Sequence, residues 1–165
     1  MGDPRVADLY RRFGPAIHSR CRRLLKDDVA AEDATQEVFV RVMRHIESAP
    51  EDRAALAWIY RISTNLCLNT LRNRGRQAEP VAELPETPGE HPEALLLDRD
   101  LAMRLVLRVP EKLRAPAVLY YVDGLEQEQV AKTLGISRRT VINRLGEFAS
   151  RARKFVARQE EVRHE

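Results

Sequence analysis

The chain has 165 residues and a mass of 18.9 kDa, which allows one ordinary domain or two small ones. Hydrophobic residues make up 44% and aromatic residues only 5%, a composition that favours helices over sheets. No apolar run reaches the length of a membrane span, and two cysteines with four scattered histidines exclude a disulfide framework and a structural zinc site. The N-terminus turns charged at once and lacks the apolar segment of a signal peptide, so we expect a cytoplasmic protein.

Charge is distributed unevenly along the chain. Residues 1–76 carry 14 Lys or Arg and 10 Asp or Glu, residues 77–93 carry none and 5, and residues 94–165 again carry 14 and 10. The middle block also holds four prolines, a density that no helix tolerates. We therefore predict two small domains, 1–76 and 94–165, joined by a flexible acidic linker, 77–93. The basic blocks suggest a polyanionic partner, although many solvated helical proteins are equally basic.

The first domain is expected to begin with two helices. The first carries an apolar residue at every fourth position, as a helix that packs on a core does: Leu9, Phe13, Ile17 and Cys21. The pair Asp27-Asp28 predicts a cap at the start of the second helix. Its core face would then comprise five apolar residues: Val29, Ala34, Val38, Val42 and Ile46.

A third helix is expected over residues 54–73, after a break at residues 48–53 that contains a proline. Its buried side would be formed by Ile59, Ile62 and Leu66. Its polar residues are spaced four, four and three apart and therefore share one face: Arg61, Asn65, Asn69 and Arg72.

The second domain is also expected to be helical, which makes the whole chain all-α. An apolar stripe of four residues ends at Pro110: Leu97, Leu101, Leu105 and Val109. The next helix spans residues 111–122, and Pro116 is expected to kink it or to shift its start. Asp123-Gly124 closes it, and a short helix over residues 127–134 precedes a longer one that begins at Arg138.

Residues 130–145 fit a helix-turn-helix. Gly135 can take the positive φ that ends the first helix, and Ser137 can cap the second. Three apolar residues would hold the second helix on the core: Ile136, Val141 and Leu145. Its outer side chains are donors of the type that reads base edges and phosphates in a major groove: Arg138, Arg139, Thr140, Asn143 and Arg144. The alternative is a helical hairpin with a solvated basic face.

Several further motifs stand in a fixed order along the chain: residues 8–16, 31–41, 57–66, 109–119 and 123–125. Together with the proline-rich linker and the helix-turn-helix, they resemble bacterial sigma-70 initiation factors of the small, two-domain extracytoplasmic-function (ECF) class. The resemblance covers residues 9–76 and 93–155. It implies that residues 1–76 form sigma region 2 and residues 94–165 form sigma region 4. It also implies three partners: core RNA polymerase, promoter DNA and an anti-sigma protein.

The resemblance implies that the second helix binds the clamp coiled coil of the polymerase β′ subunit, through Asp33, Gln36, Glu37 and Arg41. The residues themselves offer some support, since Asp33 and Glu37 are like charges four positions apart. Such a pair destabilises a helix unless a cation binds it, and a basic partner surface would supply one. The alternative is an acidic first turn that favours the helix dipole, which suits Asp33 better than Glu37.

The third helix matches the family segment that opens promoter DNA and reads the −10 element. Opening a duplex requires stacking surfaces, amide groups that read an extruded base, and cations for phosphate. The candidates are, in that order, Trp58 and Tyr60, then Asn65 and Asn69, then Arg61, Arg72, Arg74 and Arg76. The break at residues 48–53 would form the pocket for a flipped base. Core packing is an equally good interpretation of Trp58, and plain helix surface is the alternative for the two asparagines.

The helix-turn-helix matches the part of region 4 that binds the −35 element, and region 4 would also bind the polymerase β-flap. Its implied readers of DNA are Ser137, Arg138, Arg139, Thr140, Asn143 and Arg144. The chain departs from the family pattern at Ile142, Gly146 and Glu147, where cations or aromatics are usual. Glu147 would meet phosphate repulsion or accept a hydrogen bond from cytosine N4. A basic run further along either touches the DNA backbone or is a solvated face: Arg151, Arg153, Lys154 and Arg158.

No catalytic triad, Walker loop or dinucleotide fingerprint is present, so we expect no enzymatic activity, no cofactor and no metal. The resemblance further implies that the acidic linker threads the polymerase channel in place of RNA, whereas a solvated tether is the alternative. Two other functions compete with that of a sigma factor. One is a stand-alone helix-turn-helix regulator of duplex DNA, and the other is a sigma-like decoy that titrates an anti-sigma factor.

Overall fold

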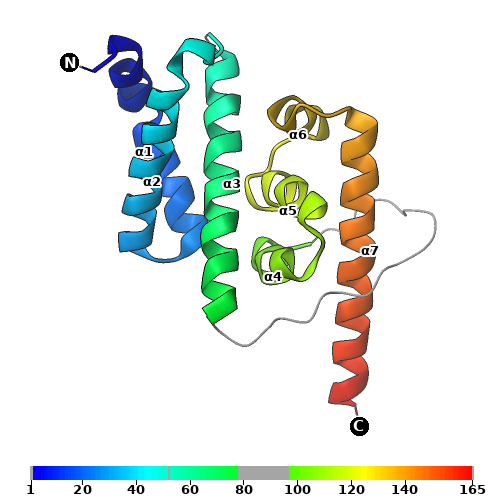
Figure 1. Cartoon of the computed structure of the whole chain (residues 1–165). Coiled ribbons are helices and arrows are strands. Elements are labelled where there is room, and N and C mark those ends of the chain that lie inside the picture. The colour runs from blue at the N-terminus through cyan, green and yellow to red at the C-terminus, as the bar shows by residue number, and fades with distance from the viewer. Residues whose placement is uncertain (1, 52, 78–96, 165) are drawn as a thin grey trace. The chain divides into compact units, whose positions relative to one another are not determined.

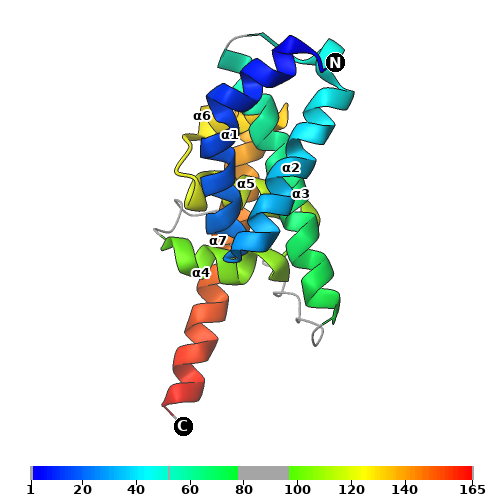
Figure 2. The ribbon, with the colours of Figure 1, turned by 90° about the vertical axis from the view of Figure 1, so that its left-hand side faces the viewer.

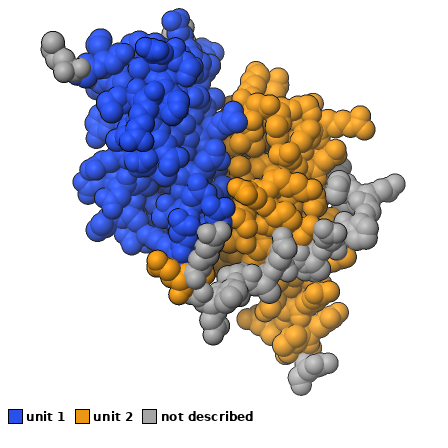
Figure 3. Space-filling model, viewed as in Figure 1, with its two compact units in different colours: residues 1–74 blue, residues 75–165 orange. Residues whose placement is uncertain are grey.

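The computed structural model describes residues 2–51, 53–77 and 97–164, and within these ranges every regular element is a helix (Figure 1). This confirms the predicted all-α fold. The chain divides into two compact units, unit 1 (Met1–Arg74) and unit 2 (Gly75–Glu165), which Figure 3 distinguishes by colour. The predicted acidic linker, 77–93, falls outside the described residues except for Gln77.

Unit 1 consists of α1 (Pro4–Leu25), α2 (Asp28–Arg44) and most of α3 (Arg53–Gln77), with a short 3-10 turn, η1 (Ile46–Ser48), after α2. Figure 2 shows α1 and α2 side by side along most of their length. Asp27 caps α2 as predicted, since its carboxylate accepts a hydrogen bond of 2.9 Å from the backbone N–H of Ala30. Lys26, with a φ of 52°, ends α1 and leads directly into this cap.

The predicted core stripes of α1 and α2 are buried, except that Phe13 is half-buried and Val29 is exposed. Ala34, Val38, Val42 and Ile46 are all less than 9% exposed, whereas Val29 is 72% exposed. The assignment of Val29 to this face is wrong because it lies five positions before Ala34, about 140° away around the helix. The buried face instead continues at Ala31, which is fully covered.

A buried arginine joins α1 to α3. The side chain of Arg20 is 1% exposed and donates hydrogen bonds to Ser63 Oγ (2.6 Å) and Thr64 Oγ1 (2.7 Å). Its guanidinium carbon also lies 4.6 Å from the centroid of the Tyr60 ring, a cation–π contact. Polar partners on α3 therefore satisfy a charge that would otherwise be costly to bury.

One turn of α3 further on, two buried cysteines meet. The Cys67 thiol donates to Cys21 Sγ at 3.7 Å, and both residues are almost fully covered. This hydrogen bond lowers the pKa of Cys21 from 9.0 to about 7, because it favours the thiolate. Burial opposes the shift, whereas a hydrogen bond from Thr35 and the charge of Arg20 support it.

Unit 2 begins with α4 (Arg99–Leu105), whose first turn is capped by Asp98 through a 2.7 Å hydrogen bond from the backbone N–H of Leu101. A 3-10 turn, η2 (Val106–Arg108), follows. Of the predicted stripe, Leu105 and Val109 are buried. Leu97 precedes the helix and is only half-buried, because the Asp98 cap starts the helix after it.

Pro116 neither shifts the start of its helix nor breaks it. The segment begins at Glu111 as α5 (Glu111–Ala117) and continues as a π-helical turn, η3 (Val118–Val122). Proline has no N–H to donate to the preceding turn, and after it the bonding widens, with Asp123 N–H donating to the Val118 carbonyl at 3.0 Å. Gly124, with a φ of 74°, closes the segment as predicted.

The last two helices are α6 (Gln127–Leu134) and α7 (Arg138–Arg163), with the boundaries at Gln127, Leu134 and Arg138 that the sequence predicts. The first half of α7 packs on α5 and α6, while its second half extends past the other helices of unit 2 (Figures 1 and 2). An ion pair of 3.5 Å between Lys112 and Glu147 fastens α5 to α7. These contacts fix the direction in which the start of α7 points relative to the rest of unit 2.

Candidate functional site

The turn between α6 and α7 has the geometry of a helix-turn-helix. Gly135 takes a φ of 67°, a left-handed conformation that side chains disfavour, and thereby ends α6. Ser137 Oγ accepts a hydrogen bond of 3.1 Å from the backbone N–H of Thr140 and so caps α7. Val141 and Leu145 are buried beneath the start of α7. The predicted roles of Gly135, Ser137, Val141 and Leu145 in this fold are confirmed.

The first turns of α7 present unpaired donors. Arg138, Arg139 and Asn143 are exposed, while Arg144 is half-buried. Within the described ranges, these four side chains make no hydrogen bond or ion pair. Thr140 differs, because its hydroxyl lies 2.8 Å from Ser137 Oγ and shares in the cap. No acidic residue stands in the first turn, so the helix dipole and the arginines together favour an anion here.

Further along α7, two charged residues turn inward. Arg151 is 2% exposed and donates to Glu147 Oε1 at 3.0 Å, while Glu147 also pairs with Lys112. The placement of Arg151 in an exposed basic run is therefore wrong: it lies four residues after Glu147 on the flank that faces α5. Glu147 is paired with two cations, and its side chain is 21% exposed. Arg153, Lys154 and Arg158 are exposed, and nothing in the structure explains the buried glycine at position 146.

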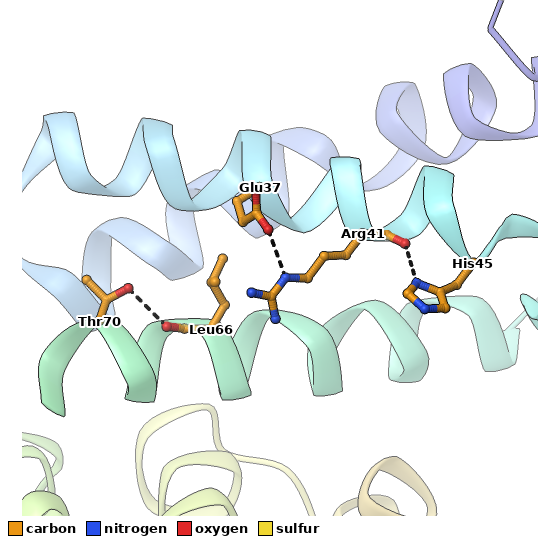
Figure 4. Close-up of polar contacts among 5 residues, drawn as sticks. All are labelled: Glu37, Arg41, His45, Leu66 and Thr70. Carbon is orange, nitrogen blue, oxygen red and sulfur yellow. Dashed lines mark hydrogen bonds and ion pairs between the residues drawn. The ribbon is translucent and has the colours of Figure 1, made fainter. Parts of the chain in front are cut away.

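The predicted clamp-binding residues lie on α2. Asp33 and Gln36 are exposed. Glu37 accepts a hydrogen bond of 3.0 Å from Nε of Arg41, as Figure 4 shows, and both side chains are about 40% exposed. Since the cation that offsets Glu37 comes from its own helix, the pairing of like charges does not by itself require a basic partner.

The predicted −10 residues lie on α3, but they are not presented equally. Arg61 and Asn65 are exposed, whereas Trp58, Asn69 and Arg72 are half-buried. Tyr60 has one ring face covered by Arg20. Arg74 donates to the Leu25 carbonyl at 3.2 Å and pairs with Asp27 at 3.5 Å, so it ties α3 to the turn between α1 and α2. The side chain of Arg76 lies outside the described residues.

Two adjoining hollows flank the segment between η1 and α3. The first, of about 420 Å³, lies between the start of α1 and this segment, and the second, of about 730 Å³, continues toward the first turn of α3. Arg12 and Glu51 line both, and Arg5 and Arg53 line one each. Arg5 also donates to the carbonyls of Ile46 and Ala49 (both 3.3 Å), which holds the segment against α1.

Comparison with known families covers both units. Residues 9–77 match the model of sigma-70 region 2, and residues 99–156 match the model of sigma-70 region 4. The RNA polymerase sigma-E factor of Streptomyces coelicolor is 30% identical over 149 residues, which cover 90% of this chain and 84% of that protein. The chain belongs to the ECF class of sigma-70 factors.

Other relatives agree with this assignment. The ECF sigma factor SigE of Mycolicibacterium smegmatis is 32% identical over 164 residues, and the match spans 94% of this chain but 63% of the length of that protein. Among solved structures, the sigma factor RpoE of Bartonella quintana, in complex with the anti-sigma factor NepR, has the same fold. Its TM-score is 0.55 at 19% identity, with 91% of this chain and 97% of that chain covered.

In this ECF factor the donor-rich start of α7 lies in region 4, and the polar face of α3 lies in region 2. No helix of the described residues is both long enough and apolar enough to cross a bilayer. Arg20 and its hydrogen-bond partners on α3 are not among the predicted residues. A signal was available, because Arg20 lies three residues after Ile17 and four before Leu24, within the apolar stripe of α1.

Proposed function

We propose that this ECF factor binds bacterial core RNA polymerase, directs it to promoters and helps to open the DNA. The observation that carries the proposal is the start of α7, which is capped at Ser137 and presents unpaired arginines. It stands in a chain whose two parts match regions 2 and 4 in the order that a sigma factor requires. The chain itself supplies promoter recognition, and polymerase supplies the chemistry of RNA synthesis.

Region 4 recognises the −35 element as duplex DNA. The first turns of α7 enter the major groove, where Arg138, Arg139 and Asn143 reach base edges or phosphates. Arg144 contributes from a half-buried position. Ser137 and Thr140 fix the helix start from which the arginines project. The same unit also contacts the β-flap of the polymerase.

Region 2 captures the −10 element as single-stranded DNA. Arg61 and Asn65 are its foremost contacts because their side chains are exposed and make no hydrogen bond or ion pair within the described residues. Trp58, Asn69 and Arg72 contribute from half-buried positions, whereas Tyr60 and Arg74 act through the packing of α1 on α3. The two hollows beside the η1–α3 segment combine arginines with apolar residues such as Phe13 and Leu56, and a pocket for an extruded base needs both kinds of side chain.

The exposed face of α2 binds the β′ clamp of the polymerase. Asp33 and Gln36 are accessible without any rearrangement, and Glu37 and Arg41 form a pair that a partner can contact as one unit. The domains have the boundaries 1–76 and 94–165, and the acidic linker 77–93 spans the polymerase between them. The protein acts in the cytoplasm, where its polymerase is found.

An anti-sigma protein holds the factor inactive. The likeness in fold to RpoE, which was solved in complex with the anti-sigma factor NepR, supports a partner of this kind. Such a protein would cover surfaces that core polymerase or promoter DNA needs.

The proposal is tested by transcription from a pool of promoter fragments by purified core polymerase, with and without the full chain. We expect new start sites that share a −35 and a −10 sequence. Stable co-elution with core without new starts would favour the decoy function instead. Duplex binding by the chain alone, with no effect of core, would favour a stand-alone regulator.

A further inference from the structure

One apolar side chain stands among the donors at the start of α7. Ile142 is 41% exposed, although its neighbour Val141 and the later Leu145 are almost fully buried. With 100° of rotation per residue, Ile142 lies about 40° from Arg138 and about 60° from Arg139 around the helix, and so between them. Its side chain leans toward the N-terminus of the helix, in the direction of the two arginines.

The exposure of Ile142 does not by itself indicate a binding role, because single exposed hydrophobic residues are common on protein surfaces. The other large exposed hydrophobics of the described residues are Tyr10, Val29, Met43 and Val162. Three of them lie in unit 1, and Val162 lies at the far end of α7. Ile142 is thus the one that is surrounded by unpaired DNA-binding donors.

The chemistry of the major groove limits the groups that an isoleucine side chain can contact there. Isoleucine can neither donate nor accept a hydrogen bond, and phosphates and polar base edges offer it nothing. The apolar group that base pairs present in this groove is the C5-methyl of thymine. Because Ile is β-branched and holds few rotamers in a helix, it offers this methyl a defined surface.

We propose that Ile142 reads the methyl group of one thymine in the −35 element and so sets part of the promoter specificity of this factor. The inference rests on the proposed function, in which the start of α7 enters the major groove. The arginines on either side hold the helix on the DNA, and Ile142 discriminates between bases at the position it covers.

The test uses the −35 site found by start-site mapping and the full chain bound to core polymerase. Each thymine of the site is replaced in turn by deoxyuridine, which removes only the methyl group. For the unsubstituted protein, we expect one such replacement to weaken binding about three- to fivefold, the effect of burying one methyl group. For Ile142→Ala, the same replacement should have no effect. Val162→Ala, an exposed apolar residue at the other end of α7, is the matched control and should behave as the unsubstituted protein does.

A second variant sharpens the result. Ile142→Lys replaces the apolar side chain with a cation, so it should lose the sensitivity to deoxyuridine. It should also gain dependence on salt, with a slope of log Kd against log[salt] that is steeper by about one phosphate contact.

Equal binding of thymine and deoxyuridine at every position overturns the inference and leaves the proposed function intact, as does a methyl effect that persists in Ile142→Ala. Loss of sensitivity to an anti-sigma partner in Ile142→Ala, with no methyl effect on DNA, would assign the residue to protein binding instead. Absence of any sequence-specific −35 binding overturns both the inference and the proposed function.

Discussion

The start of α7 and the surroundings of α3 both contain arginines, but most of the arginines around α3 have bonds within the fold. The start of α7 is fixed by a glycine turn and a serine cap, and Arg138 and Arg139 make no hydrogen bond or ion pair within the described residues. Around α3, cations hold the unit together: Arg20 bonds to Ser63 and Thr64, and Arg74 bonds to the turn before α2. A cation is therefore available to DNA where backbone caps stabilise the fold instead.

This contrast gives each arginine an expected signature. A cation that is free should affect DNA binding and leave stability unchanged when it is removed. A cation that holds helices together should affect stability first.

The largest effect is expected from Arg20→Ala. The change removes two buried hydrogen bonds and leaves a cavity between α1 and α3, so it should lower the free energy of unfolding of unit 1 by about 3 kcal/mol. Trp58 is the single tryptophan of the chain and lies in α3, so its fluorescence in urea reports on unit 1. Arg11→Ala, on the same helix but 77% exposed, is the control and should leave the urea midpoint unchanged. Equal urea midpoints for Arg20→Ala and the unsubstituted protein would show that Arg20 does not stabilise unit 1.

The next effect concerns α7. Arg139→Ala should weaken binding of the −35 duplex by about 1–3 kcal/mol, the value of one good contact to a base, with no change in unfolding. Arg163→Ala, at the end of the same helix, should bind nearly as well as the unsubstituted protein. A loss of stability without a loss of affinity would place Arg139 among the structural cations. Gel-shift titration at fixed salt measures the affinity.

Two arginines of α3 allow the contrast to be tested within one helix. Arg61→Ala should slow promoter opening about tenfold and leave the unfolding of unit 1 unchanged, because Arg61 is exposed and makes no hydrogen bond or ion pair within the described residues. Arg74→Ala should lower the stability of unit 1 by about 1 kcal/mol, because it loses its bonds to Leu25 and Asp27. Opening rates are followed with a fluorescent base in the −10 element. If the two variants exchanged these properties, the bonds that an arginine makes within unit 1 would be a poor guide to its function.

The smallest effect is a dependence of stability on pH. The folded pKa of Cys21 is about 7, below its ordinary value of 9.0, so between these values the unfolded chain binds the proton more tightly. The stabilising contribution is therefore fully present above pH 9 and is lost as the pH falls through 7, with a slope of at most about 1.4 kcal/mol per pH unit. Urea midpoints of unit 1 between pH 7 and 9 should rise for the unsubstituted protein and stay flat for Cys21→Ser. The same rise in both would show that another group titrates.

Features that depend on neighbouring residues in the sequence could be predicted. The cap at Asp27, the turn at Gly135 and the start of α7 after Ser137 follow from local backbone chemistry, and each is present. The polar face of α3 could be predicted as a face, since periodicity alone defines it. Periodicity does not indicate which residues of α3 are accessible. Accessibility depends on residues such as Arg20 and Asp27, which lie about 45 positions away from their partners on α3.

The errors have the same origin. Residue type predicts a core position for Val29, although its angular position on the helix is wrong for one, and it predicts an exposed position for Arg151, because arginines are usually exposed. Burial of Arg151 requires the carboxylate of Glu147, which is itself held by Lys112 from α5. Contacts of this kind between helices are not encoded in any local pattern.

The most direct test of the division between the two surfaces is permanganate mapping of unpaired thymines in promoter complexes of core polymerase with the full chain. We predict reactive thymines in the −10 element that require both core and this protein. An Arg61→Ala, Asn65→Ala double variant should keep the protection of the −35 element and lose this reactivity. Unchanged reactivity with the double variant would contradict the account, because it would mean that the exposed face of α3 does not hold the opened strand.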